Sequence, residues 1–346
     1  MTHIESLLEE RKLPSLVFDR KQAIDLLSEY VYGKTPEFTG EVSGEVTKSE
    51  ICYAGNGLRE YVDLSFDVPG GRFTFPFVLS SPQLKFDRPP RLFVFLNFRP
   101  NCPDIYYPEE LLLRNNFAVA RICYTDVTAD SEVLDGLAAY YSREESNSVG
   151  KIGLWAFAAS RVLDYCISLN RNYKGYGVIG HSRLGKTALW AGAQDERFDF
   201  VCSNCSGCSG TAITRNKIGE NIEAITRVFP FWFCPKYTEF ANREAELPVD
   251  QHLLLSLIAP RKLSIVSASN DSWADPTSEF LACCAASKVW EEKGLTGFVH
   301  PDRMALYEER FHEGNIGYYL REGNHYLSQL DWLAHMSFWN KRNSVW

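Results

Sequence analysis

The first quarter of the chain contains two different patterns of hydrophobic and polar residues. Residues 2–32 show helical spacing, whereas residues 45–80 alternate between apolar and polar positions, which is the period of a half-buried strand. Gly70-Gly71 interrupts this alternation and is typical of a tight turn between antiparallel strands. The strands predicted in this region are Val46–Tyr53, Arg59–Val68 and Arg72–Leu79.

From residue 91 onward, short runs of almost continuous apolar residues alternate with stretches of helical spacing. A strand that is apolar at every position is typical of a parallel sheet covered on both faces, and strands that alternate with helices are joined by right-handed crossovers. The predicted strands are Arg91–Asn97, Phe117–Tyr124, Tyr176–Gly180, Phe198–Asn204, Lys262–Ala268 and Ile316–Arg321. Helices are predicted over residues 150–170, 184–193, 249–258, 277–293 and 327–341.

The chain shows no internal division. No linker rich in Pro, Gly or Ser interrupts it and no repeat is evident, so we expect residues 1–346 to form one domain. Within it, residues 1–90 provide the N-terminal helix and antiparallel strands, and residues 91–346 provide the α/β core. Residues 205–248 lack clear alternation and are predicted to form a loop-rich insertion over the C-terminal edge of the sheet, where such folds bind ligands.

The charge balance excludes two classes of partner. The chain carries a net charge of −8, from 36 Lys and Arg residues against 44 Asp and Glu residues, so nucleic acids and anionic membrane surfaces would repel it. No uninterrupted apolar segment approaches the roughly 18 residues that a membrane span needs. The N-terminus lacks the basic flank and apolar stretch of a signal peptide, and we therefore expect a cytoplasmic protein.

The ten cysteines are predicted to be reduced. Most lie singly in apolar runs, as Cys123 and Cys166 do, where cysteine behaves as a small core residue. One cluster, formed by Cys202, Cys205 and Cys208, has the spacing of a metal or iron–sulfur loop, but no second cysteine pair or nearby histidine completes a ligand set. We therefore expect no metal and no organic cofactor, and the role of these three thiols stays open.

The strongest local signal is the segment from Tyr176 to Trp190, in which a buried strand, a sharp turn around Ser182 and a helix follow one another. In α/β-hydrolases this arrangement is a nucleophile elbow, which lifts Ser Oγ clear of the sheet and directs the next backbone N–H toward the oxyanion. The pattern departs from G-x-S-x-G, because the second glycine is Gly185, one position late. The alternative is an ordinary Gly/Ser turn of an α/β protein.

A serine nucleophile needs a base, and the base needs an acid to orient it. The strand Lys262–Ala268 leads directly into Asp271, and the strand Ile316–Arg321 leads into His325. Ser182, Asp271 and His325 thus each follow the C-terminal end of a predicted strand, in the chain order of α/β-hydrolases. The pattern predicts a Ser-His-Asp triad. Asp275 is the rival acid, and beside Pro276 it is alternatively a turn or helix N-cap residue.

The remaining histidines compete poorly for the role of base. His181 precedes the nucleophile and is predicted to point away from Ser182 Oγ, as a structural residue. His252 is predicted to brace a helix, with the pocket lining as the alternative. The others are predicted to be surface or packing residues: His3, His300, His312 and His335.

Several blocks of the sequence together resemble the glucuronoyl esterases, carbohydrate esterase family fifteen, whose bacterial members are often labelled acetyl xylan esterases. The resemblance covers residues 90–340, and a Ser-Arg-x-Gly-Lys elbow with the late glycine is a hallmark of that family. The blocks are Gly180–Phe198, Ser206–Gly210, Phe229–Cys234, Leu247–Arg261 and Asp271–Pro276.

The resemblance implies an α/β-hydrolase fold, with a mostly parallel central sheet between layers of helices, and a serine esterase without a cofactor. Its substrate would be a small-molecule or oligosaccharide ester of 4-O-methyl-glucuronic acid. Ser182 would be the nucleophile, His325 the base, and Arg183 the oxyanion stabiliser through its N–H and guanidinium. Lys186 would bind sugar hydroxyls, unless it is an exposed helical lysine. Three further residues would line the sugar site: Trp273, Glu220 and Trp232.

One position departs from the family pattern. Many relatives place the catalytic acid as a Glu just before the Ser-Gly at 206, and Cys205 stands there in this chain. A thiol cannot serve as a carboxylate, so the triad requires Asp271 as its acid. A general carbohydrate deacetylase with the same triad, and a non-catalytic carbohydrate-binding protein, stay open as alternatives. The oligomeric state and the natural alcohol are open as well.

Overall fold

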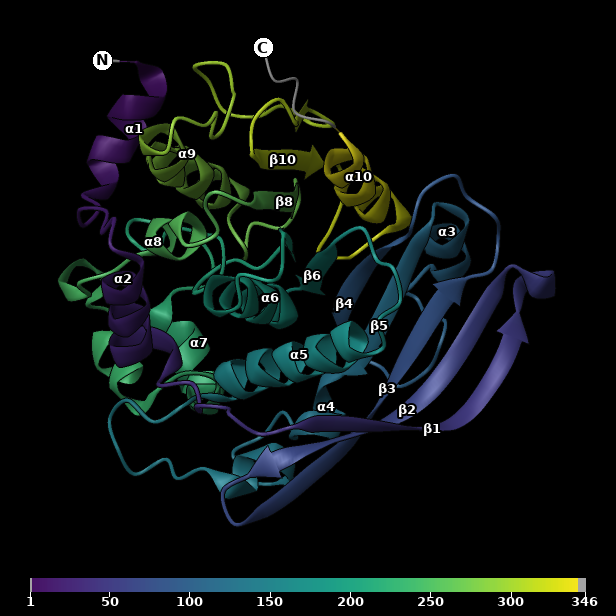
Figure 1. Ribbon diagram of the computed structural model, residues 1–346. Helices are drawn as coiled ribbons and strands as arrows, with labels where there is room; N and C mark the ends of the chain where they lie inside the picture. Colours follow the sequence, from purple (N-terminus) through teal and green to yellow (C-terminus); the bar gives the residue numbers. More distant parts are fainter. Residues whose placement is uncertain (1, 342–346) are drawn as a thin grey trace.

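The computed structural model describes residues 2–341, and in this part of the chain a ten-stranded sheet forms the centre of the molecule (Figure 1). Its strand order is β1-β2-β3-β5-β4-β6-β7-β8-β10-β9, with parallel pairing from β5 to β10 and antiparallel pairing at both edges. The strands are β1 (Val42–Cys52), β2 (Gly57–Val68), β3 (Gly71–Pro82), β4 (Arg91–Asn97), β5 (Phe117–Cys123), β6 (Tyr176–His181), β7 (Phe200–Asn204), β8 (Lys262–Ala268), β9 (Arg310–Phe311) and β10 (Ile316–Arg321).

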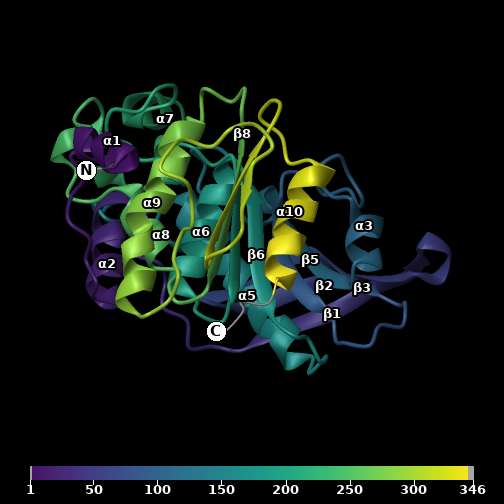
Figure 2. The same ribbon diagram turned by 90° about the horizontal axis from the view of Figure 1, so that it is seen from above.

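Helices cover both faces of the sheet, which confirms the predicted three-layer α/β architecture (Figure 2). One face carries α5 (Lys151–Ser168), α6 (Arg183–Gln194), α8 (Gln251–Ser256) and α9 (Pro276–Glu292), and the other carries α3 (Glu109–Arg114) and α10 (Gln329–Asn340). The other helices are α1 (His3–Arg11), α2 (Arg20–Leu27), α4 (Tyr124–Val127) and α7 (Ile222–Val228). No helix among residues 2–341 combines the length and the apolar character that a membrane crossing requires.

The two-residue period of β4 divides its side chains between two cores. Val94 and Leu96 belong to the core under α5 and α6, whereas Phe93 and Phe95 belong to the core under α3 and α10. Phe93 packs against Trp339 of α10 with ring centroids 4.7 Å apart. Every residue of the predicted strand except Arg91 is buried, because both faces are covered, and this is why the strand reads as a continuous apolar run.

The N-terminal region differs in detail from the sequence prediction. The predicted helical stretch 2–32 is split into α1, α2 and a π-helix at Ser28–Tyr32, because Lys12 adopts a left-handed φ of 49° that ends α1. The hairpin turn between β2 and β3 is Pro69-Gly70 rather than Gly70-Gly71, since Gly71 already pairs with Val68. The φ of Gly70 is 77°, a backbone conformation that glycine adopts at no steric cost.

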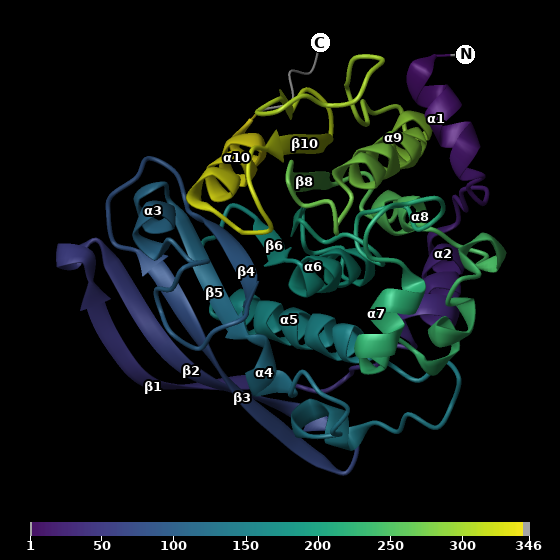
Figure 3. The same cartoon turned by 180° about the vertical axis from the view of Figure 1, so that it is seen from behind.

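Residues 205–248 follow β7 at the C-terminal edge of the sheet. They contain α7 and short 3₁₀ turns at Pro230–Trp232, Pro235–Phe240 and Glu244–Glu246. Figure 3 shows α7 near one end of α5, where the 3₁₀ turn at Pro230–Trp232 packs against the first residues of that helix. This segment therefore borders the edge of the sheet at which the candidate site residues gather.

Candidate active site

Ser182 stands in the sharp turn between β6 and α6. Its φ of 57° and ψ of −126° lie outside the regions that side-chain-bearing residues normally adopt, which is the strained geometry of a nucleophile elbow. The backbone holds this turn in place, because the N–H of Ser182 donates to the Asn204 carbonyl at 2.9 Å and its own carbonyl accepts from the N–H of Gly185 at 2.9 Å.

The late glycine of the elbow has a steric reason. A Cβ at Gly185 would lie 2.9 Å from both Ser203 Oγ and Ser206 Cβ, so only glycine lets α6 approach β7 and the segment after it this closely. A Cβ at Gly180 would lie 2.0 Å from the Leu184 carbonyl oxygen. Both glycines thus serve the tight strand-to-helix connection that presents Ser182.

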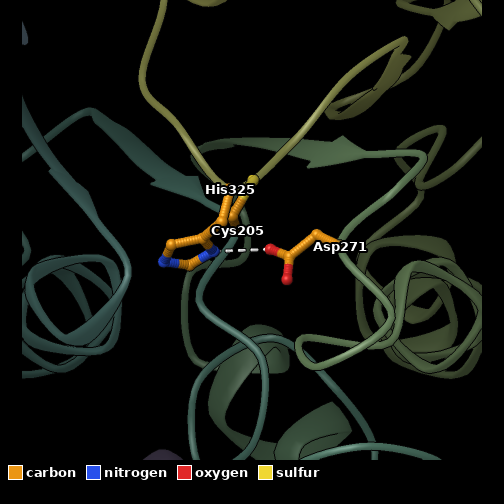
Figure 4. Close-up of side chains that lie close together, drawn as sticks. All are labelled: Cys205, Asp271 and His325. Carbon is orange, nitrogen blue, oxygen red and sulfur yellow. Dashed lines mark hydrogen bonds and ion pairs between the residues drawn. The ribbon is translucent and has the colours of Figure 1, made fainter.

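His325 and Asp271 form a hydrogen-bonded pair (Figure 4). The Nδ1 atom of His325 lies 2.5 Å from Asp271 Oδ2, and because a carboxylate only accepts, Nδ1 carries the hydrogen. Asp271 follows β8 and His325 follows β10, and these strands are neighbours in the sheet. Burial opposes ionisation of Asp271, but the hydrogen bond and charge of His325 and the Ala274 N–H together hold the pKa of Asp271 below its ordinary value.

The serine, the histidine and the arginine share one cavity. Ser182, Arg183 and His325 line a hollow of about 340 Å³ together with Phe98, Arg99, Tyr106 and His181. Among residues 2–341 no hydrogen bond joins Ser182 Oγ to His325. Catalytic hydrogen bonds of this kind often tighten only when the substrate is bound, so the shared cavity is compatible with the predicted proton transfer.

Arg183 is held from behind by a carboxylate. Its guanidinium pairs with Asp130, which also accepts hydrogen bonds from Trp232 Nε1 at 2.6 Å and from the Tyr124 hydroxyl at 2.9 Å. The guanidinium carbon lies 4.7 Å from the centre of the Trp232 ring and 5.2 Å from that of Phe229. Trp232 is buried and stacks on Phe229, so it braces Arg183, and its predicted contact with a sugar stays a prediction.

Three of the predicted sugar-binding residues lie together on the side of the insertion. Lys186 is buried, not an exposed helical lysine, and its Nζ donates to the Ser206 carbonyl at 2.5 Å and lies 3.7 Å from Glu220 Oε2. The N–H of Glu220 donates to the carbonyl of Trp273 at 3.0 Å, which ties the insertion to the loop after β8. The Trp273 side chain is exposed, as a ring that meets a sugar face must be.

Cys205 lies beside the His325–Asp271 pair. Its φ of 47° is left-handed, its side chain is 1% exposed, and its Sγ lies within 4.8 Å of a carboxylate oxygen of Asp271 and a ring nitrogen of His325. Burial raises the pKa of the Cys205 thiol well above its ordinary value, so the thiol is neutral near pH 7. A neutral thiol cannot stabilise an imidazolium as a carboxylate does, and Asp271 is the carboxylate that contacts His325.

The other polar candidates take structural positions. His181 is buried, its Nδ1 lies 2.5 Å from Asn204 Oδ1, and its ring centroid lies 4.4 Å from that of His325. Burial and the nearby His325 lower the pKa of His181 to about 3, so its ring is neutral near pH 7. Asp275 is the N-cap of α9 and accepts from the Ser278 N–H. His252 Nε2 lies 3.0 Å from the Pro14 carbonyl and braces the N-terminal segment.

The sequence prediction did not include two acidic residues near the site. Asp130 follows β5 by a few residues, and the rule that places ligand-binding residues after parallel strands would have pointed to it. Glu279 is fully buried in α9 and accepts from the Gly207 N–H at 2.9 Å and from Ser267 Oγ at 2.5 Å. Burial raises the pKa of Glu279 to about 7. No local motif marks this carboxyl group.

Comparison with known sequences gives consistent results. A family model described as fungal glucuronyl esterase matches residues 103–294. The carbohydrate esterase MZ0003 of an unknown prokaryotic organism is 32% identical over 366 residues, which cover 92% of this chain and 83% of that protein. The 4-O-methyl-glucuronoyl methylesterase of Podospora anserina is 32% identical over 161 residues, which cover 43% of this chain and 33% of that protein.

Solved structures are similar over most of the chain. A glucuronoyl esterase from Solibacter usitatus has a TM-score of 0.82 at 30% identity and covers 92% of this chain and 91% of that chain. A promiscuous CE15 esterase from a marine bacterial metagenome also has a TM-score of 0.82 at 30% identity, over 92% of this chain and 90% of that chain. These similarities confirm the predicted α/β-hydrolase fold.

Proposed function

The chain belongs to the glucuronoyl esterase family, carbohydrate esterase family fifteen, and we propose that it hydrolyses esters of 4-O-methyl-glucuronic acid with Ser182, His325 and Asp271 as its catalytic triad. As a member of this family it is a carbohydrate esterase. The observation that supports the triad most directly is the 2.5 Å hydrogen bond between His325 Nδ1 and Asp271 Oδ2, beside the cavity that Ser182 lines.

In the proposed reaction, Ser182 Oγ attacks the ester carbonyl carbon while His325 Nε2 takes the serine proton. Asp271 keeps the other hydrogen on Nδ1, which leaves the lone pair of Nε2 free to accept, and it stabilises the imidazolium that forms. The alcohol leaves with the proton from Nε2. A water molecule, deprotonated at Nε2, then attacks the acyl-enzyme and releases the uronic acid.

Arg183 would stabilise the oxyanion in two ways. Its N–H is the first of α6, and an N–H at this position has no acceptor within the helix. Arg183 lines the same cavity as Ser182, and its guanidinium is fixed by Asp130, so it need not reorganise when negative charge develops on the carbonyl oxygen. Loss of one such donor costs about 3 kcal/mol of transition-state stabilisation in serine hydrolases.

Lys186, Glu220 and Trp273 would bind the sugar. The Lys186 ammonium and the Glu220 carboxylate lie 3.7 Å apart and offer a donor and an acceptor to neighbouring hydroxyls. The exposed ring of Trp273 presents a flat apolar surface to the C–H groups of a pyranose. Because Lys186 lies one helical turn after Ser182, these contacts would position the uronate beside the nucleophile.

The test compares initial rates on methyl and benzyl glucuronate with the rate on 4-nitrophenyl acetate, for the wild-type chain and for Ser182→Ala. We expect the uronate esters to be preferred and both activities to disappear in Ser182→Ala, because only the Oγ nucleophile is removed. Labelling with a fluorophosphonate, which reacts with an activated serine, checks the elbow without any choice of substrate.

Other outcomes would replace the proposal. Activity on the acetate alone would keep the triad and favour a general carbohydrate deacetylase. A folded protein without activity on either ester and without fluorophosphonate labelling would favour a non-catalytic carbohydrate-binding protein. Unchanged activity in Ser182→Ala would exclude Ser182 as the nucleophile.

A further inference from the structure

The fold supplies the ligands that the cysteine cluster lacks in the sequence. Cys205 follows β7, Asp271 follows β8 and His325 follows β10, and these three strands are consecutive in the sheet. The Cys205 Sγ, a carboxylate oxygen of Asp271 and a ring nitrogen of His325 therefore all lie within 4.8 Å of one another. Figure 4 shows the sulfur close to the hydrogen bond between the other two side chains.

These three donors form a set that suits zinc. Thiolate, imidazole and carboxylate are the ligand types that Zn²⁺ takes in proteins, and three protein ligands with one open position is the usual number in an accessible zinc site. Bond lengths of about 2.0 to 2.3 Å in a tetrahedron place pairs of donors about 3.3 to 3.7 Å apart. Shifts of about 1 Å or less would bring the three side chains to these distances.

The charge of the three donors and their access from the cavity also suit a bound zinc ion. A Cys205 thiolate and the Asp271 carboxylate would together balance the charge of a divalent cation. The His325 side chain is 42% exposed, so an ion can approach from the active-site cavity, which His325 lines. Cys202 and Cys208 are equally buried but lie outside the three-donor cluster.

We propose that Cys205, Asp271 and His325 bind Zn²⁺ and that its binding inhibits the esterase. The inhibition rests on the proposed function, because it requires His325 to be the catalytic base. The site is inhibitory rather than a cofactor site, since the ion occupies the two groups that the triad uses.

The protonation states explain how the ion would stop the reaction. Zn²⁺ bonds to Cys205 Sγ and displaces the thiol proton to solvent, because a coordinated thiol is deprotonated. It bonds to His325 Nδ1, whose hydrogen moves through solvent to Nε2, and to the carboxylate of Asp271. The net change is the uptake of one Zn²⁺ and the release of one proton. With Nε2 protonated, His325 cannot accept the proton of Ser182.

The first measurement is the rate of ester hydrolysis as Zn²⁺ is added, with each variant compared with its own metal-free rate. Cys205→Ser removes the soft ligand at almost constant volume, and Cys205→Ala is the second variant in case the serine disturbs folding. Cys202→Ser is the matched control, because Cys202 is also buried and lies in β7, the strand that Cys205 follows. A chelator should restore the rate of the inhibited wild-type enzyme.

The second measurement does not depend on activity. Co²⁺ replaces Zn²⁺ in such sites, and a cobalt–thiolate bond absorbs in the near ultraviolet. We expect this absorption in the wild-type chain and in Ser182→Ala, and we expect it to be absent in Cys205→Ser and Cys205→Ala. If the chain hydrolyses no ester, the proposed function fails, but this absorption still decides whether the metal site exists.

The expected result is that Cys205→Ser and Cys205→Ala need at least about tenfold more Zn²⁺ for half-inhibition, while Cys202→Ser behaves as the wild type. Equal sensitivity of the wild-type chain and both Cys205 variants would overturn the proposal. Absence of the cobalt–thiolate absorption in the folded wild-type chain would also overturn it.

Discussion

At the scale of single residues, the arrangement at Ser182 shows how the chain maintains a strained backbone. A non-glycine residue in this conformation costs about 1 to 3 kcal/mol. The hydrogen bonds from Ser182 N–H to the Asn204 carbonyl and from Gly185 N–H to the Ser182 carbonyl, both 2.9 Å long, offset this cost. The absence of side chains at Gly180 and Gly185 lets strand, turn and helix pack closely enough for these bonds to form.

Two neighbouring aspartates allow a direct test of the catalytic acid. Asp271→Asn should lower turnover by roughly 10⁴-fold, because an amide cannot hold the imidazole in the right tautomer or stabilise its charged form. Asp275→Asn should leave turnover within about twofold, since asparagine also caps a helix and tolerates the left-handed φ of 65° at this position. Turnover numbers on the same uronate ester check this pair. A larger loss in Asp275→Asn would exclude Asp271 as the acid.

At the scale of elements, a buried lysine fixes the loop that carries Asp130. Lys151 is the first residue of α5 and is 1% exposed, and its Nζ donates to the carbonyls of Ala129 at 2.6 Å and Val133 at 2.7 Å. The loop between α4 and α5 is thereby anchored from inside. Asp130 meets Arg183 as part of a fixed element, so we expect it to act as a positioning residue for the guanidinium.

A double-mutant cycle tests this positioning role. Asp130→Asn keeps one acceptor oxygen, for Trp232, but it removes the charge that holds Arg183 and the second oxygen, which Arg183 and Tyr124 share. We therefore expect a fall in kcat of about 10-fold or more with little change in KM. In an Arg183→Ala background the same substitution should have almost no further effect. Asp126→Asn, an exposed carboxylate in α4, is the matched control. Fully additive losses would show that Asp130 acts independently of Arg183.

The elements that the sequence predicted well are those with a strong apolar signal. The strands β4, β8 and β10 have the predicted bounds, because burial on both faces makes most of their positions apolar. The short elements α3 and β9 were not predicted, because six and two residues are too few to show a period. The same limit applies to the site: positions after strands could be predicted, but the contact of Cys205 with the His325–Asp271 pair depends on strand order, which periodicity does not contain.

At the scale of the whole molecule, buried ionisable groups couple folding to pH. His181 and His335 are 3% and 0% exposed, and burial lowers the pKa of each to about 3 from an ordinary value of 6.5. Glu279 shows the opposite shift, since burial raises its pKa from 4.5 to about 7. The histidines oppose stability in acid, whereas the protonated glutamic acid favours it.

Between pH 4.5 and 6.5, unfolding takes up one proton in total through these three groups. The unfolded chain binds one more proton at each histidine, and the folded chain binds one more at Glu279. These groups should therefore lower the free energy of unfolding by about 1.4 kcal/mol for each pH unit below 6.5. Above pH 6.5 the two histidines are neutral in both states and do not lower the stability. Their destabilising effect grows as the pH falls from 6.5 toward 3.

His335→Gln isolates this contribution. Glutamine can keep the hydrogen bond that joins His335 Nδ1 to Ser264 Oγ at 2.8 Å, but it does not titrate, so the remaining shifts of His181 and Glu279 should cancel. We expect the decline in the free energy of unfolding between pH 6.5 and 4.5, measured by urea denaturation, to become shallower by about 1.4 kcal/mol per pH unit. The exposed His3→Gln is the control and should leave the slope unchanged. If the free energy of unfolding of His335→Gln declines as steeply as that of the wild type, His335 is protonated in the folded chain and its burial does not destabilise the charged ring.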